Sequence, residues 1–132
     1  MDAVEIRAWF DGYLRAFAAR GRGESDDLHM LLQYYGVPLL LSTDEAALAL
    51  TTEDEVLNAV RQQMEGMRAA KYDRSETLNA ETVALNATTA IHTADFSRQR
   101  TDGSEIGRLR ATYLITDGPK GRRISAVAVR TL

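Results

Sequence analysis

The sequence predicts an α+β fold in which three helices of the N-terminal half lie on one face of an antiparallel sheet of about 4–6 strands. Three observations support this fold. Apolar residues recur at helical spacing through residues 3–20, a capping motif starts a further helix at Thr52, and apolar and polar residues alternate from residue 75 to residue 131. Runs of helices followed by runs of strands are typical of this class. At 132 residues the chain is expected to form one domain, residues 1–132.

The first predicted helix spans residues 3–20 and is amphipathic. Charged residues such as Arg7 and Asp11 fall largely on one side of it. Gly21 and Gly23 are expected to end it. The other side carries apolar residues at i, i+3, i+4, i+7 spacing, namely Ile6, Trp9, Phe10, Tyr13, Leu14 and Phe17.

A second, shorter helix is predicted from Ser25 to Tyr35. Ser25 is a suitable N-cap, and two aspartates follow it in the first turn, where negative charge matches the helix dipole. Gly36, as a left-handed C-cap, and Pro38 are expected to end this helix.

A short hairpin and a third helix are predicted next. Residues 37–42 and 46–50 are predicted to form the hairpin. A capping box is predicted to follow. In it the Thr52 hydroxyl accepts a hydrogen bond from the Glu55 amide, and the Glu55 carboxylate accepts one from the Thr52 amide. The helix is expected to run to about Lys71.

The alternation of apolar and polar residues in the second half of the chain predicts four consecutive strands. Their connections are short, and Asp102-Gly103 is a strong hairpin signal. Strands joined this tightly are antiparallel neighbours, so a meander is expected. A longer turn is predicted from Asp117 to Gly121. The predicted strands are residues 75–85, 88–100, 105–116 and 122–131.

Composition and charge exclude several classes of protein. The chain has no cysteine, which excludes disulfides and thiolate metal sites. Its longest apolar run, residues 37–41, is far too short for a membrane span, and its acidic N-terminus is unlike a secretory signal. Residues 67–132 carry 11 basic and 7 acidic groups, but without long basic runs or interleaved aromatics. We expect a cytoplasmic protein without a nucleic-acid or membrane partner.

Several segments together resemble the nuclear-transport-factor-2-like superfamily, the cone-shaped fold of ketosteroid isomerases and SnoaL-like polyketide cyclases. The resemblance covers nearly the whole chain. It implies a strongly bent sheet whose concave face and helices enclose a pocket, and frequent dimerisation through the back of the sheet. It rests on Trp9-Phe10-Asp11-Gly12-Tyr13, Leu31 to Pro38, the capped helix from Thr52, Ala90-Ile91-His92, Arg98 to Gly103, Tyr113-Leu114-Ile115 and Gly121 to Ile124.

One departure from the family argues against isomerase-type chemistry. Members that work by proton transfer commonly carry an aspartate on the strand after the second helix. Residues 36–42 contain no carboxylate here. The nearest, Asp44, falls in a predicted turn, where a solvated carboxylate is a poor general base at neutral pH.

Three residues are the candidates for catalysis: His92, Tyr13 and Tyr113. His92 is predicted mid-strand between small residues that leave room for a ligand, and a histidine there can shuttle protons near neutral pH. The alternative is a structural histidine bonded to the backbone, or a histidine on the exposed back of the sheet. Asp95 cannot orient it without a bulge, because three positions along a strand reverse the side-chain direction. The two tyrosines can polarise a carbonyl, or they are core aromatics with satisfied hydroxyls.

The remaining predicted site residues would bind the ligand: Trp9, Phe17, Tyr35, Phe96 and Arg98. No cofactor is expected. No metal site is expected either, because the two histidines, His29 and His92, lie on different elements.

Two functions remain open. One is a small-molecule-binding protein of the SnoaL-like type, with the possibility of isomerase, dehydratase or cyclase activity on an apolar carbonyl or cyclic ligand. The other is a non-catalytic homodimeric module that binds another protein through the back of the sheet or the mouth of the cone. Val127 and Val129 suggest a last strand that is apolar on both sides.

Overall fold

The computed structural model describes residues 1–132 and contains three helices and six strands. The α+β class is therefore confirmed. In chain order the elements are α1 (Ala3–Gly21), the 3-10 helix η1 (Leu28–Gln33), β1 (Tyr35–Ser42), β2 (Ala47–Leu50), α2 (Glu53–Ala69), β3 (Tyr72–Ala84), β4 (Thr89–Arg100), β5 (Glu105–Gly118) and β6 (Gly121–Thr131).

All six strands belong to one sheet with the order β2-β1-β6-β5-β4-β3. The predicted antiparallel meander is confirmed for β3 to β6, and the β1–β2 hairpin is confirmed as well. The hairpin joins the meander through a parallel pair, β1 with β6. Because β1 and β6 are far apart in the chain, no local turn signal could predict this pair.

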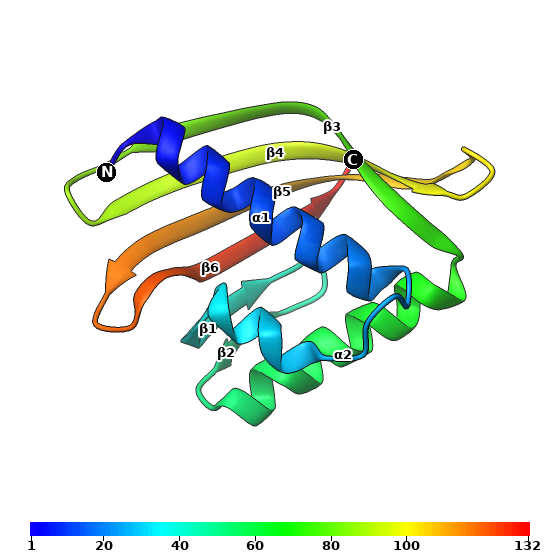
Figure 1. The fold of residues 1–132 in the computed structure, drawn as a ribbon, viewed down its shortest axis with the longest axis horizontal. Helices are drawn as coiled ribbons and strands as arrows, with labels where there is room; N and C mark the ends of the chain where they lie inside the picture. The colour runs from blue at the N-terminus through cyan, green and yellow to red at the C-terminus, as the bar shows by residue number, and fades with distance from the viewer.

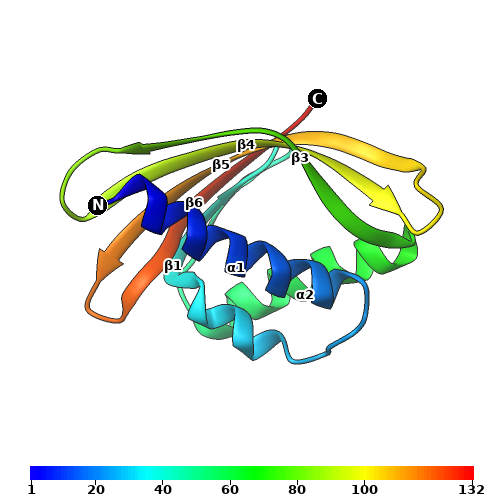
Figure 2. The same cartoon turned by 45° about the horizontal axis from the view of Figure 1, so that its top comes forward.

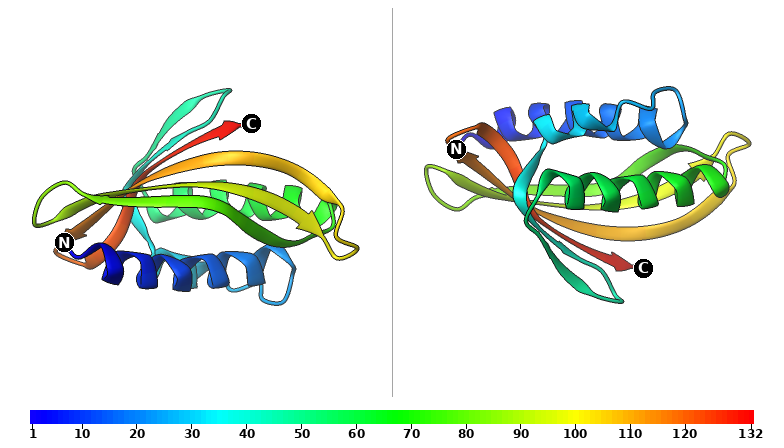
Figure 3. Two further views of the ribbon diagram at one scale, coloured as in Figure 1. Left: turned by 90° about the horizontal axis from the view of Figure 1, so that it is seen from above. Right: turned by 90° about the horizontal axis from the view of Figure 1, so that it is seen from below.

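The sheet is strongly curled but does not close. It arches over α1 and α2 (Figures 1 and 2). Both helices run along the long axis of the molecule (Figure 3). In β3 the register shifts between Thr77 and Asn79, and the strand bends sharply along its length (Figure 1). Such a bulge increases the local twist of a strand, which helps the sheet to curl.

Helix α1 follows its predicted amphipathic pattern. The Asp2 carboxylate caps it by accepting a hydrogen bond from the Val4 amide at 2.8 Å. Ile6, Phe10 and Phe17 are buried against the sheet and the other helices. They belong to one hydrophobic cluster of 22 buried residues, which fills most of the space under the arch.

The second predicted helix is wrong in type and in length. Only residues 28–33 are helical, in a 3-10 helix, and Tyr35 begins β1. Gly36 is not a left-handed C-cap but a residue of the strand. Pairing with β6 explains the difference, because the Ile124 amide donates a hydrogen bond to the Tyr34 carbonyl at 2.7 Å. At Gly36 a Cβ would lie 3.1 Å from the Ile124 carbonyl oxygen, so the close approach of the two strands favours glycine.

Helix α2 starts at the predicted cap. The Thr52 hydroxyl accepts the Glu55 amide at 3.2 Å. The Glu55 carboxylate, however, accepts the amide of Thr51 at 2.8 Å rather than that of Thr52. The helix ends at Ala69, two residues before the predicted end, and Lys71 leaves it with a positive φ of 65°. None of the helices is long and apolar enough to cross a bilayer.

The two faces of the central strands differ as the alternation predicts. Ala111, Tyr113 and Ile115 of β5 are buried towards the helices, whereas Arg108 and Arg110 are exposed on the outer face. The longer turn predicted after Asp117 is wrong. There β5 continues to Gly118 and β6 begins at Gly121, because Gly118 and Gly121 pair across a two-residue turn.

Candidate functional site

A small apolar cavity lies between the helices and the concave face of the sheet. Its volume is about 60 Å³, and 16 of its 19 lining residues are hydrophobic. Pockets for drug-sized ligands have roughly 300–1,000 Å³, so side chains fill most of the hollow under the arch. Room remains for a few water molecules or a short carbon chain. We call this space the inner cavity.

Three tyrosines bring their rings together on the inner cavity. Tyr13 comes from α1, Tyr35 from β1 and Tyr113 from β5. The ring centre of Tyr13 lies 5.5 Å from that of Tyr35 and 6.0 Å from that of Tyr113. A hydrogen bond of 2.5 Å joins the hydroxyls of Tyr13 and Tyr35. Alternation along β5 places Tyr113 on the inner face, and helical spacing places Tyr13 on the buried side of α1.

The three phenols stay protonated at neutral pH. Burial raises the pKa of Tyr13 well above its usual value, and the nearby Tyr35 raises it further. Burial raises the pKa of Tyr35 to about 12 and raises that of Tyr113 as well. Because they remain neutral, these groups can donate hydrogen bonds to a ligand oxygen but cannot act as bases.

Arg98 lies at the mouth of the inner cavity. It is half-buried, and its Cζ atom lies 5.8 Å from the centre of the Phe17 ring. Together with Leu109 and Val129, Arg98 also lines a groove of about 420 Å³ outside the cavity. Because these three residues line both spaces, we call the boundary between the cavity and the groove the mouth of the inner cavity. The positive charge of Arg98 partly opposes the rise in pKa of the three phenols.

His92 is buried outside the lining of the inner cavity. Its ring lies 4.1 Å from the ring of Phe10, and its Nδ1 is 2.7 Å from the Thr82 hydroxyl. Burial lowers the pKa of His92, the charge of Arg7 lowers it further, and Asp11 partly compensates. The imidazole is therefore mostly neutral at pH 7.

The low pKa of His92 predicts a loss of stability in mild acid. Unfolded histidine titrates near 6.5, so a folded state with a lower pKa loses stability as the pH falls from about 6.5 through the folded pKa. Between pH 7.5 and pH 5.5 the free energy of unfolding of the wild type, measured in urea, should fall more than that of His92→Gln. His29→Gln changes an exposed histidine and should keep the wild-type slope. Equal slopes for all three proteins would contradict this assignment.

The structure brings six of the eight predicted site residues together. Trp9 and His92 do not line the cavity. Trp9 is half-buried and packs on Tyr34, with their ring centres 5.4 Å apart. The six that line the inner cavity are Tyr13, Phe17, Tyr35, Phe96, Arg98 and Tyr113.

Sequence reasoning missed the part of the cavity wall that α2 and the β1–β2 hairpin supply. Val56 and Val60 contribute from α2, and Leu39 and Leu50 from the hairpin. The i, i+4 spacing of the two valines was a usable signal, because it places both on one face of the helix.

Two carboxylates considered from the sequence lie elsewhere. Asp44 lies in the turn between β1 and β2, where it accepts the Thr131 amide at 2.9 Å. Asp95 lies on the outer face of β4 and forms an ion pair with Arg110 at 2.7 Å, which lowers the pKa of Asp95. Nowhere are three or more His, Asp or Glu side chains gathered as they would be around a metal ion.

Comparisons with known proteins agree with this architecture. The profile of a family described as "NTF2-like protein (DUF6841)" matches residues 4–132. Among curated proteins none matches the sequence.

Several solved structures share the fold. An NTF-2-like protein of unknown function from Shewanella oneidensis superposes with a TM-score of 0.73 at 17% identity, over 98% of this chain and 99% of that one. An NTF2-like protein with a cystatin-like fold from Novosphingobium aromaticivorans gives 0.74 at 14% identity, over 99% and 82%. A ketosteroid isomerase-like protein from Erwinia carotovora gives 0.69 at 15% identity, over 98% and 95%. At these identities the likeness concerns the fold alone.

Proposed function

Because the chain belongs to the NTF2-like protein (DUF6841) family, whose fold encloses a hollow between helices and sheet, we propose that it binds a small apolar ligand with a carbonyl group in the inner cavity. The observation that carries the proposal is the cluster of Tyr13, Tyr35 and Tyr113 in an otherwise apolar space. Hydrogen-bond donors buried in an apolar cavity are well placed to bind a ligand oxygen, because few water molecules compete with the ligand there.

The phenols support polarisation of a carbonyl rather than removal of a proton. Their raised pKa values keep the hydroxyl protons in place at neutral pH. Neutral donors aimed at a carbonyl oxygen stabilise negative charge that develops on it. This is the part of isomerase, dehydratase or cyclase chemistry that these residues can supply. His92 packs against Phe10 and does not line the inner cavity, so the phenols supply the hydrogen bonds to the ligand.

The proposal is tested with the small ketone 2-pentanone as probe, its binding followed by ligand-observed NMR. The wild type is expected to bind it. Tyr113→Phe should weaken binding about three- to tenfold, the usual value of one hydrogen bond. Ala111→Leu places extra carbon atoms in the inner cavity and should abolish binding.

The matched control is Ala8→Leu, which adds the same atoms to an exposed position of α1. It should bind the ketone as the wild type does, and melting temperatures verify that all variants are folded. Lack of binding by the wild type, or equal binding by Ala111→Leu and wild type, would overturn the proposal.

The outer face of the sheet favours a second role, as the interface of a homodimer. Val127 and Val129 do not lie on this face, because both line the inner cavity. The outer face instead carries Leu40, which is 49% exposed, and its neighbour across the parallel pair, Ala126. Exposed apolar patches commonly mark interaction surfaces.

Light scattering tests this second role. The wild type is expected to be a dimer at micromolar concentration, and Leu40→Asp is expected to be a monomer because it places a charge in the interface. Leu85→Asp changes an equally exposed leucine outside the sheet, in the turn after β3, and should remain dimeric. A monomeric wild type would remove this role.

A further inference from the structure

We infer that the ligand of the inner cavity is a short oxo acid, whose carboxylate binds to Arg98 at the mouth while its carbonyl-bearing chain enters the cavity. This inference rests on the proposed function and adds the charge of the ligand to it.

Arg98 differs from every other sheltered arginine of the chain. Arg98 alone among the six buried or half-buried arginines has no hydrogen bond and no ion pair to the protein. No buried side-chain nitrogen of the chain lacks a partner, so the unbonded N–H groups of Arg98 reach water and can exchange that water for an external anion. The five that are bonded are Arg20, Arg68, Arg100, Arg122 and Arg123.

The contacts of Arg98 leave its hydrogen-bond donors free. Its guanidinium lies over the Phe17 ring, which attracts a cation without accepting its N–H groups. On the inner face of β4 it follows Phe96 by two residues, so both side chains point to the helices. A guanidinium held in this way presents a planar fork that matches the two oxygens of a carboxylate.

The location of Arg98 determines which end of the ligand it would bind. Arg98, Leu109 and Val129 line both the inner cavity and the groove outside it. A head group at Arg98 would therefore remain close to water, which lowers the cost of desolvating its charge. The carbon chain of the ligand would enter the apolar cavity, where the three phenols can donate hydrogen bonds to its carbonyl oxygen.

Other charged groups of the groove leave Arg98 available. Arg108 forms an ion pair with Glu105 at 2.9 Å. Asp44 and Glu45 are exposed in the turn across the groove, and neither forms an ion pair with Arg98. Water and salt screen charges at such exposed positions, so they weaken the attraction of a carboxylate only modestly.

The size of the cavity limits the length of the acid. A volume of about 60 Å³ accepts a chain of a few carbon atoms and excludes a large ring system. Levulinate, a five-carbon acid with a ketone group, has the required parts. Its amide, levulinamide, has the same shape and lacks the charge, so the two probes isolate the contribution of the carboxylate.

The inference is tested by measuring the binding of levulinate and levulinamide by ligand-observed NMR. The wild type is expected to bind levulinate at least about tenfold more tightly than levulinamide, the usual range of a charge-assisted hydrogen bond. Arg98→Met should remove this preference, because it should weaken levulinate binding far more than levulinamide binding. Arg98→Lys should restore part of the preference. Arg130→Met removes an exposed arginine of the outer face that has no partner, and should behave as the wild type.

The outcomes separate this inference from the proposed function. Equal binding of acid and amide by the wild type, with 2-pentanone still bound, would overturn the oxo acid and leave the carbonyl-binding cavity standing. Undiminished preference for levulinate in Arg98→Met would overturn the role of Arg98. Failure of the wild type to bind levulinate, levulinamide and 2-pentanone alike would overturn both.

Discussion

Phe10→Ala is expected to lower the free energy of unfolding by about 3–5 kcal/mol, the usual cost of removing a phenylalanine from a packed core. Phe10 is 1% exposed. Its ring centre lies 4.1 Å from that of His92, 4.7 Å from that of Tyr113 and 5.3 Å from that of Tyr13. Alanine would leave a cavity where α1 meets β4 and β5. Urea unfolding measures the change.

The matched control for Phe10→Ala is Val4→Ala, on the same helix. Val4 is 72% exposed, so its truncation should change stability by no more than about 0.5 kcal/mol. A cost below about 1 kcal/mol for Phe10→Ala would mean that this junction is not closely packed.

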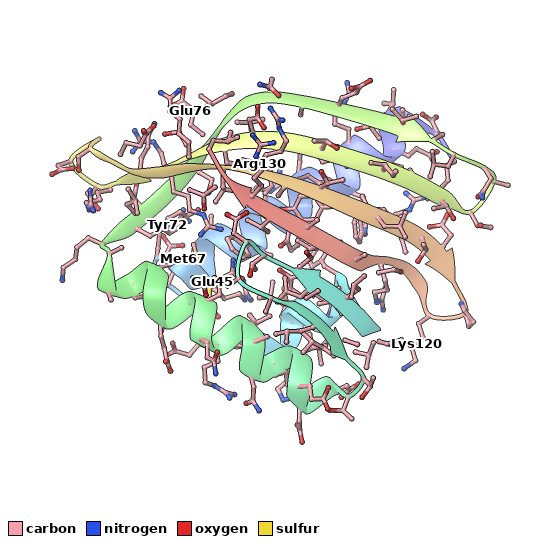
Figure 4. The ribbon with its side chains drawn as sticks, turned by 180° about the vertical axis from the view of Figure 1, so that it is seen from behind. Glu45, Met67, Tyr72, Glu76, Lys120 and Arg130 are labelled. Atoms are coloured by element: carbon pink, nitrogen blue, oxygen red, sulfur yellow. The ribbon has the colours of Figure 1, made fainter.

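Gly21→Ala is expected to destabilise the protein by about 1–3 kcal/mol, although alanine is the better helix former. A Cβ at Gly21, the last residue of α1, would lie 2.6 Å from the Met67 Cε and 2.9 Å from the Tyr72 ring. Both side chains are buried where α2 ends and β3 begins (Figure 4). The methionine can turn aside, but Tyr72 is held by a hydrogen bond of 2.8 Å to Ser75. Thermal and urea unfolding both measure the effect.

Gly66→Ala provides the control with the opposite sign. Gly66 is an exposed residue inside α2, and a Cβ there would meet nothing within 4 Å. The substitution should therefore stabilise the protein by about 0.5–1 kcal/mol. Stabilisation by both substitutions would show that the packing around Gly21 is loose.

Local patterns of the sequence predict most of the secondary structure and the direction of the aromatic side chains. The spacing along α1 places Tyr13 and Phe17 on the buried side, and alternation along β5 places Tyr113 on the inner face. These predictions succeed because each depends only on the period of one element. Five of the six predicted site residues that line the inner cavity follow such a period, and Tyr35 is the exception.

Long-range contacts decide what the local patterns do not. Tyr35 has the spacing of a helix, but its pairing with Ile124 of β6 makes it the first residue of β1. His92 points to the helices as expected, yet Phe10 packs on it and it does not line the cavity. The absence of a partner for Arg98 also depends on the tertiary structure, because none of the neighbouring elements places a hydrogen-bond acceptor next to its guanidinium.

The position of β6 within the sheet affects the order in which the fold can be assembled during synthesis. Of the six strands β6 is synthesised last, yet it lies between β1 and β5. Until β6 emerges, β1 of the hairpin has no strand of the meander to pair with. The nascent chain then exposes apolar surface that the folded protein covers. Pairing that spans such a stretch of chain also slows folding, because a large loop must be closed first.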